Sequence, residues 1–172
     1  MEARQQVWED RLGSHDKLRV GLAWSGNPNH ANDRNRSLRL ETLSRIFDLD
    51  AQFVSLQKDA KAEDKALLCE CANVIDASEH LTDFAETAAL VSCLDLVITV
   101  DTSVAHLAGA IGARTWLLLP YTPDYRWLLD RDDSPWYPTM RLFRQSDTRD
   151  YGAVLDRVRK ELQIALSNHA IR

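Results

Sequence analysis

Four polar residues with the potential to bind phosphate stand together near the middle of the chain. Asp101, Thr102 and Ser103 directly follow the apolar run of residues 96–100, and His106 comes three positions later. The backbone N–H groups in the first turn of a helix have no partner within the helix and bind anions, and hydroxyl side chains add hydrogen bonds. The stretch therefore predicts a phosphate site, although Asp and Thr before an apolar helix are also ordinary helix caps.

His106 would lie one turn into that helix, on the face next to the helix start. A lone histidine on an apolar helix is more often packed than functional. The positive end of the helix dipole disfavours protonation of an imidazole, so we expect the pKa of His106 to be lowered. The neutral ring would then donate a hydrogen bond to a diphosphate oxygen or a sugar hydroxyl.

A second polar group follows the apolar run of residues 18–24. The loop of residues 25–37, SGNPNHANDRNRS, is longer than the roughly two to six residues usual between a strand and a helix, which suggests function or mobility. The residues of interest in or near it are Ser25, Gly26, Arg34, Arg36 and, after a second strand, Lys58. Separate cations are usually solvated, but cations that converge from two strand ends would neutralise a leaving diphosphate.

Strands and helices that alternate along the chain would position these residues. Continuous apolar runs, typical of parallel strands buried on both faces, occupy residues 18–24, 52–56, 73–75, 96–100, 115–119 and 140–143. Apolar residues at helical spacing lie between them, and Ser37 is the predicted N-cap of the first intervening helix. About six strands and about five helices predict an α/β fold, a doubly wound, Rossmann-like parallel sheet of strand order 3-2-1-4-5-6.

That strand order places the first and fourth strands side by side. Their C-terminal loops, residues 25–37 and 101–106, would flank the crevice at the topological switch point, where open α/β sheets bind ligands. We therefore expect the two polar groups to meet in one crevice.

The composition is that of a globular domain and gives no reason to expect nucleic acid as a partner. The chain has 172 residues, 45% of them apolar and 27% charged, and a formal charge of −5. No apolar run approaches the roughly 20 residues of a membrane span. The three cysteines make no disulfide framework and the N-terminus lacks a signal-peptide pattern, so we expect a cytoplasmic protein.

Common cofactor motifs are missing from the sequence. It contains no G-x-G-x-x-G of a dinucleotide-binding strand, no P-loop G-x-x-x-x-G-K-[ST] and no G-x-S-x-G nucleophile turn. Cys69 and Cys71 have no second Cys or His pair at zinc spacing, so packing in a helix is the simpler interpretation. We expect no metal and no cofactor, and phosphate capture by a helix terminus with help from side chains.

Four ordered segments resemble a known family. The stretch VITVDTSVAHLAGAIG resembles the signature of the heptosyltransferase-like glycosyltransferases of family nine, in which D-[ST]-x-x-x-H-x-A lines the donor site. Together with GLAWSGNPNHANDRNRSL, FVSLQKD and PYTPDYRWLLDRDDSPWYPTMRLFRQ, it is similar to the glycosyltransferase domain that follows tetratricopeptide repeats in many bacterial proteins. The resemblance spans nearly all of residues 18–166.

This resemblance implies the C-terminal, donor-binding half of a GT-B fold, in which two Rossmann-like domains enclose the active site. By motif position, it implies a site for a nucleotide-diphosphate sugar at Ser25, Gly26, Arg36, Lys58, Asp101, Thr102, Ser103 and His106. The catalytic base would come from the N-terminal half, outside this chain. We expect residues 1–16 to be a connecting helix from missing upstream sequence, either an N-terminal domain or repeats, and residues 17–172 to be the nucleotide-sugar-binding domain.

Three functions stay open on the sequence. The first is the donor-binding domain of a metal-independent inverting glycosyltransferase that is inactive alone. The second is a non-catalytic interaction or regulatory module beside a repeat array. Its contact surface would consist of the aromatic residues Tyr121, Tyr125, Trp127, Trp136 and Tyr137, if these are exposed. The third is sugar-nucleotide epimerisation, which requires its own catalytic carboxylates and both halves of the fold.

Overall fold

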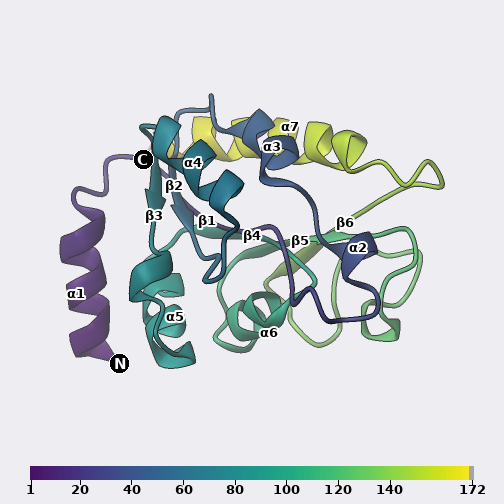
Figure 1. Ribbon diagram of the computed structural model, residues 1–172, viewed down its shortest axis with the longest axis horizontal. Coiled ribbons are helices and arrows are strands. Elements are labelled where there is room, and N and C mark those ends of the chain that lie inside the picture. The colour runs from purple at the N-terminus through teal and green to yellow at the C-terminus, as the bar shows by residue number, and fades with distance from the viewer. Residues whose placement is uncertain (171–172) are drawn as a thin grey trace.

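A six-stranded parallel sheet forms the centre of the computed structural model, which describes residues 1–170 (Figure 1). Its strands are β1 (Arg19–Ala23), β2 (Gln52–Ser55), β3 (Val74–Asp76), β4 (Leu96–Val100), β5 (Thr115–Leu119) and β6 (Met140–Arg144). Their order is β3-β2-β1-β4-β5-β6, which confirms the predicted doubly wound topology. Each strand agrees with its predicted range to within one residue at either end.

Helices cover both faces of the sheet. On one face lie α3 (Leu40–Leu43), α4 (Ala62–Glu70) and α7 (Tyr151–Ala170); on the other lie α5 (Phe84–Val91) and α6 (Ser103–Ala110), with α1 (Glu2–Leu12) beside α5 (Figure 1). The shorter turns are α2 (Asp33–Arg36), η1 (Ser44–Ile46), η2 (Ser78–His80) and η3 (Tyr125–Trp127). Separate sets of buried apolar side chains fill the space between the sheet and each layer of helices.

Strands β1 and β4 lie next to each other in the middle of the sheet, and every residue of both is buried. Leu22 of β1 pairs in register with Ile98 of β4, so both strands end at the same edge. The absence of a side chain at Gly21 lets Leu94 pack against β1, because a Cβ at this position would lie 2.5 Å from Cδ1 of Leu94. The loops that follow the two strands therefore start side by side.

The loop after β1 contains more regular structure than its composition predicts. Residues 25–37, expected as an irregular loop, include the single helical turn α2. Ser37 is not the predicted N-cap of the next helix, because α3 begins at Leu40 after Arg39. The Oγ of Ser37 instead accepts a hydrogen bond from the N–H of Gly26, 2.9 Å away. The loop thus closes on itself at the end of β1.

The N-terminal helix α1 packs against α5. Trp8 and Leu12 of α1 are buried, and Nε1 of Trp8 donates a hydrogen bond to Glu86 of α5 over 3.0 Å. Residues 1–16 therefore contain the predicted helix, while its role as a connection to another domain stays a prediction. No helix in the described part of the chain is long and apolar enough to cross a membrane.

Candidate functional site

A groove of about 1370 Å³ lies at the C-terminal ends of β1, β2 and β4. The predicted site residues that line it are Ser25, Gly26, Arg36, Lys58, Thr102 and Ser103. These residues come from three separate segments of the chain, which the strand order brings together at the switch point. The structure thus joins the polar loop after β1 and the polar turn before α6 in one groove.

The start of α6 faces this groove without a side-chain cap. Thr102 occupies the N-cap position, but its hydroxyl lies 3.3 Å from the hydroxyl of Thr99 and does not bond the first helical turn. The N–H groups of Ser103 and Val104, both residues of the groove wall, have no hydrogen-bond partner within residues 1–170. Unsatisfied N–H groups at the positive end of a helix attract an anion, so this is the strongest anion-binding feature of the groove.

The N–H groups at the end of β1 are, in contrast, already satisfied by side chains. The N–H of Ser25 donates to Oε1 of Gln57 over 3.1 Å, and that of Gly26 donates to Ser37. The Oγ of Ser37 in turn donates to Asp33 over 2.8 Å. Sequence reasoning missed Gln57, although its position beside Lys58 at the end of β2 is a signal that could have identified it.

Arg36 links the two sides of the groove. Its Nε lies 3.3 Å from Oδ1 of Asp33, and its Nη1 donates to the backbone carbonyl of Asp101 over 2.9 Å. The guanidinium packs under Gly26, where a Cβ would lie 2.5 Å from Nη2. Only 13% of the side chain is exposed, so Arg36 braces the loops as well as lining the groove.

The groove carries both signs of charge. Lys58 is exposed, and its Nζ donates to the backbone carbonyl of Thr82 over 3.3 Å. The cationic residues of the groove wall are Arg34, Arg36, Arg39, Lys58 and Lys61, and the acidic ones are Asp33, Glu41, Asp59, Glu63, Asp64 and Asp83. Because cations and carboxylates are nearly equal in number, the predicted convergence of basic residues does not make the groove strongly positive. The feature of the groove that favours an anion is therefore the start of α6, and not the net charge of the wall.

Asp101 and His106 lie outside the groove wall, on the other side of the turn. The ring of His106 stacks on Trp127, with centroids 5.3 Å apart, and its Nδ1 lies 3.1 Å from the hydroxyl of Tyr137. Its Nε2 lies 3.7 Å from Oδ1 of Asp101. The pKa of His106 is lowered as expected, but burial is the main cause, partly opposed by the charge of Asp101. Sequence reasoning did not connect either aromatic residue with His106.

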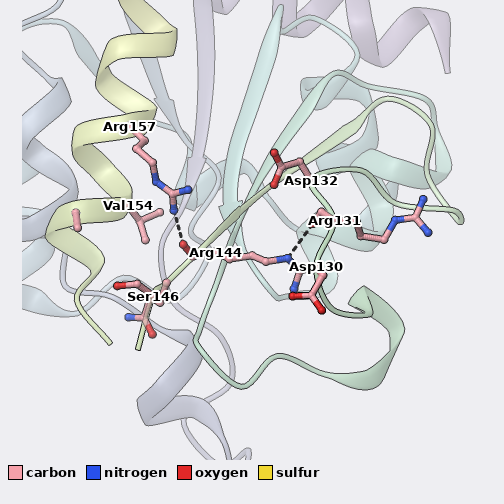
Figure 2. Close-up of a pocket in the computed structure, with 9 residues that line it drawn as sticks. Asp130, Arg131, Asp132, Arg144, Ser146, Val154 and Arg157 are labelled. Carbon is pink, nitrogen blue, oxygen red and sulfur yellow. Dashed lines mark hydrogen bonds between the residues drawn. The ribbon is translucent and has the colours of Figure 1, made fainter. Parts of the chain in front are cut away.

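A smaller cavity of about 610 Å³ lies between residues 130–132, the end of β6 and the start of α7 (Figure 2). Arg144 reaches across it, and its guanidinium donates to the backbone carbonyl of Arg131 over 2.9 Å (Figure 2). It also donates to the backbone carbonyl of Trp127 over 2.6 Å. Arg157 of α7 donates to the carbonyl of Arg144. Burial lowers the pKa of Arg144. The hydrogen bonds of its guanidinium fix the backbone of this loop. This cavity shares no lining residue with the groove.

The described residues contain no cluster of three or more His, Cys, Asp or Glu side chains with the geometry of a metal site. Cys69 is exposed on α4 and Cys71 is partly buried just after it. Burial raises the pKa of the Cys71 thiol.

Comparison with known protein families shows the family of this chain. Residues 47–153, more than half of the chain, match glycosyltransferase family 9 (heptosyltransferase). The chain belongs to glycosyltransferase family 9. The matched part of this family 9 domain includes Lys58 and the turn between β4 and α6, whereas the loop after β1 lies outside it. No curated protein matches the sequence significantly.

Solved structures share the fold of this family 9 domain. The E. coli ADP-heptose LPS heptosyltransferase II aligns with a TM-score of 0.65 and 18% identity, over 99% of this chain and 53% of that one. A family 9 glycosyltransferase from Veillonella parvula aligns with a TM-score of 0.65 and 14% identity, over 91% and 44% of the two chains. E. coli heptosyltransferase WaaC, solved with ADP-2-deoxy-2-fluoro heptose, aligns with a TM-score of 0.59 and 11% identity, over 91% and 47%.

These three likenesses establish the GT-B-like fold of the domain and leave its substrate open, because their identities are low. The chain spans about half the length of each of these proteins. The fold expected from the sequence is therefore confirmed.

Proposed function

We propose that this domain binds the nucleotide-diphosphate sugar donor of an inverting glycosyltransferase in the groove. The diphosphate would lie at the start of α6, where Thr102, Ser103 and Val104 line the wall. The single observation that carries the proposal is that this helix start opens into the groove with no side-chain cap. Membership of family 9 supports it, since one member of that fold was solved with an ADP-sugar analogue.

In the proposed reaction an acceptor hydroxyl attacks the anomeric carbon of the sugar, and the bond from that carbon to the diphosphate oxygen breaks. The nucleoside diphosphate leaves with the electron pair, and a base takes the proton of the acceptor hydroxyl. The N–H groups of Ser103 and Val104 would stabilise the growing charge on the leaving diphosphate, with Lys58 and Arg34 nearby. We propose that this charge is offset without a metal ion.

Calorimetric titration of the chain with ADP, UDP and GDP, and with their sugars, in buffer containing EDTA tests the proposal. We expect one diphosphate to bind with a Kd on the order of 10–100 μM, and its monophosphate to bind more weakly. Lys58→Ala should weaken this binding, and Lys160→Ala is its control, because Lys160 of α7 lies outside the groove wall. Failure of every nucleotide to bind at millimolar concentration would overturn the proposal.

A sharper test removes one backbone donor. Ser103 is the first residue of α6, a position that tolerates proline, and Thr102 before it has φ −140° and ψ 175°, which a following proline permits. Ser103→Pro should therefore keep the helix and lose the N–H group, and we expect diphosphate affinity to fall about tenfold. The matched control Ser103→Ala loses the hydroxyl but keeps the N–H. Equal affinities of the two variants would contradict a diphosphate bound to this amide.

We further propose that the acceptor site and the catalytic base belong to another domain, since the chain spans about half the length of the family 9 enzymes that share its fold. The isolated chain would then bind donor and transfer no sugar. From the sequence resemblance and composition alone, we propose an association with tetratricopeptide repeats and a cytoplasmic location. Sugar transfer by the isolated chain would contradict the proposal that the acceptor site and the catalytic base belong to another domain.

A second candidate is an interaction module that uses the loop between β5 and β6. Tyr125, Trp136 and Leu129 are 81%, 63% and 68% exposed, an unusual concentration of apolar surface. The surface is smaller than the sequence suggested, because Trp127 is fully buried and Tyr137 partly so. Rapid proteolytic cleavage within residues 120–138 of the isolated chain would favour this candidate. Full protection together with nucleotide binding would favour the first.

A further inference from the structure

We propose that Tyr137 is a positioning residue that holds His106 as the neutral Nε2–H tautomer, with this N–H directed at the carboxylate of Asp101. The three side chains then form a chain of contacts behind the turn between β4 and α6. The proposal rests on the proposed function only in its consequence for donor binding, because the tautomer is a property of the protein itself.

The position of the Tyr137 ring is determined by α6. A Cβ at Gly109 would lie 2.5 Å from Cγ of Tyr137, so the ring occupies the space that a side chain would otherwise fill. Gly109 follows His106 by three residues and shares its helix face. The same ring lies 6.2 Å from that of Trp127, on which the imidazole stacks. Glycine and tryptophan therefore hold the hydroxyl at hydrogen-bond distance from Nδ1.

Electrostatics select the tautomer. A neutral imidazole has one N–H and one lone pair, and Nε2 lies 3.7 Å from Oδ1 of Asp101. A lone pair on Nε2 would face a carboxylate that is only 12% exposed, and two acceptors repel each other. With the proton on Nε2, the lone pair of Nδ1 accepts the hydroxyl proton of Tyr137 over 3.1 Å. This tautomer gives the Tyr137 hydroxyl an acceptor and turns an N–H group, in place of a lone pair, toward the carboxylate of Asp101.

Burial, and not the charges around the ring, favours the neutral form. Asp124, the N-cap of η3, and Arg126 of η3 pair with each other over 2.9 Å, and their charges act on the pKa of His106 in opposite directions. Asp101 faces it from the end of β4 and favours protonation, whereas burial against Trp127 disfavours it more strongly. The pKa of His106 is consequently below its ordinary value, and the ring is neutral near pH 7.

The consequence for the groove is mechanical. Asp101 directly precedes Thr102, and its backbone carbonyl accepts the hydrogen bond from Arg36. His106 holds the carboxylate on one side of this residue while Arg36 holds the carbonyl on the other. The turn that presents the N–H groups of α6 is thereby fixed from both sides, so loss of the Tyr137 hydroxyl should loosen it.

Long-range ¹H–¹⁵N NMR spectra of the imidazole groups test the tautomer directly in the unmodified chain. We expect His106 to have its proton on Nε2, and a proton on Nδ1 overturns the proposal. In Tyr137→Phe we expect a mixture of tautomers and a higher pKa of His106, because the donor that stabilised the neutral ring is gone. An unchanged tautomer and pKa in this variant also overturns it.

Donor binding gives the second readout. ADP affinity should fall about three- to tenfold in Tyr137→Phe, while Tyr125→Phe, in the same loop but 81% exposed, should leave both the tautomer and the affinity unchanged. If ADP does not bind the unmodified chain, the proposed function fails and the NMR result still decides the role of Tyr137. If ADP binds and Tyr137→Phe changes the tautomer alone, the claimed effect on the groove is wrong.

Discussion

Nη1 of Arg36 donates a hydrogen bond to the backbone carbonyl of Asp101, 2.9 Å away, and so joins two loops that lie 65 residues apart in the sequence. The bond connects α2, in the loop after β1, to the end of β4 across the topological switch point. The groove keeps its shape through this contact, which no local sequence pattern contains.

Replacement of Arg36 by methionine should therefore separate the two loops. We expect the free energy of unfolding to fall by about 1–2 kcal/mol, because the carbonyl of Asp101 and the carboxylate of Asp33 both lose a donor. Urea unfolding measures this change, and calorimetry should detect weaker nucleotide binding. Arg34→Met is the matched control, since Arg34 is exposed on the same helix α2. Equal losses of stability in both variants would contradict the bracing role of Arg36.

Gly26→Ala should be destabilising through the same contact. The new Cβ would lie 2.5 Å from Nη2 of Arg36 and 2.9 Å from Oδ1 of Asp33, so one of them must move, at a cost of about 1–3 kcal/mol. Gly152→Ala in the first turn of α7 is the control, because the nearest atoms there are ends of side chains at 3.1 Å and alanine favours a helix. Thermal unfolding compares the two. In the Arg36→Met background the cost of Gly26→Ala should shrink; an undiminished cost would show that the two positions act independently.

The pair of Glu9 and Arg19 should make stability depend on pH. Arg19 is fully buried, with Nη1 2.5 Å from Oε2 of Glu9, and its hydrogen bond is the main cause of the lowered pKa of Glu9. A carboxyl with a lowered pKa stabilises the fold above its unfolded pKa of about 4.3, and this contribution is lost as the pH falls through the folded value. We expect Glu9→Gln to lower the free energy of unfolding at pH 7 by about 1 kcal/mol, a modest value because Glu9 is partly exposed.

Urea unfolding at pH 7 and at about pH 3 measures this pH dependence. The difference between the two values should be smaller in Glu9→Gln than in the unmodified chain, because the substituted side chain does not titrate. Glu2→Gln, at an exposed position of the same helix, should keep the original difference. A pH dependence that is the same in all three proteins would exclude a contribution from Glu9.

Tyr151→Phe should loosen α2 from the other side. The hydroxyl of Tyr151, at the start of α7, donates to the backbone carbonyls of Arg36 at 3.1 Å and Asn35 at 3.2 Å. Burial, with the charge of Asp101, raises the pKa of Tyr151, so the hydroxyl keeps its proton. We expect a loss of about 1 kcal/mol in unfolding free energy and a smaller loss of nucleotide affinity than in Arg36→Met. Tyr121→Phe, whose hydroxyl has no partner within residues 1–170, should change neither quantity.

The architecture was predictable because it depends on periodic features that are local in sequence. Residues 96–100 and 115–119 are continuous apolar runs, and strands buried on both faces require such runs. Right-handed crossovers then leave few possible strand orders. Gly112, with φ 75°, ends the segment of α6 as its position in the sequence indicates.

The residues around the groove were predictable only in part. Thr102, Ser103 and Lys58 could be placed at strand ends by position alone, and the structure brings all three to the groove. The residues that form hydrogen bonds with these segments could not be predicted. Oε1 of Gln57 accepts a hydrogen bond from the N–H of Ser25, which lies 32 residues earlier in the sequence. No pattern within either segment specifies that pairing.

By itself, the sequence determined that this chain is a doubly wound α/β domain with a polar turn before an apolar helix, because strand periodicity, helix starts and glycine positions are properties of neighbouring residues. Only the tertiary structure decided that Arg36 braces Asp101, that His106 turns from the groove toward Trp127 and Tyr137, and that the groove has nearly balanced charges. The physical reason is that burial, hydrogen-bond partners and net local charge depend on side chains brought together from distant segments. They exist only once the sheet has formed.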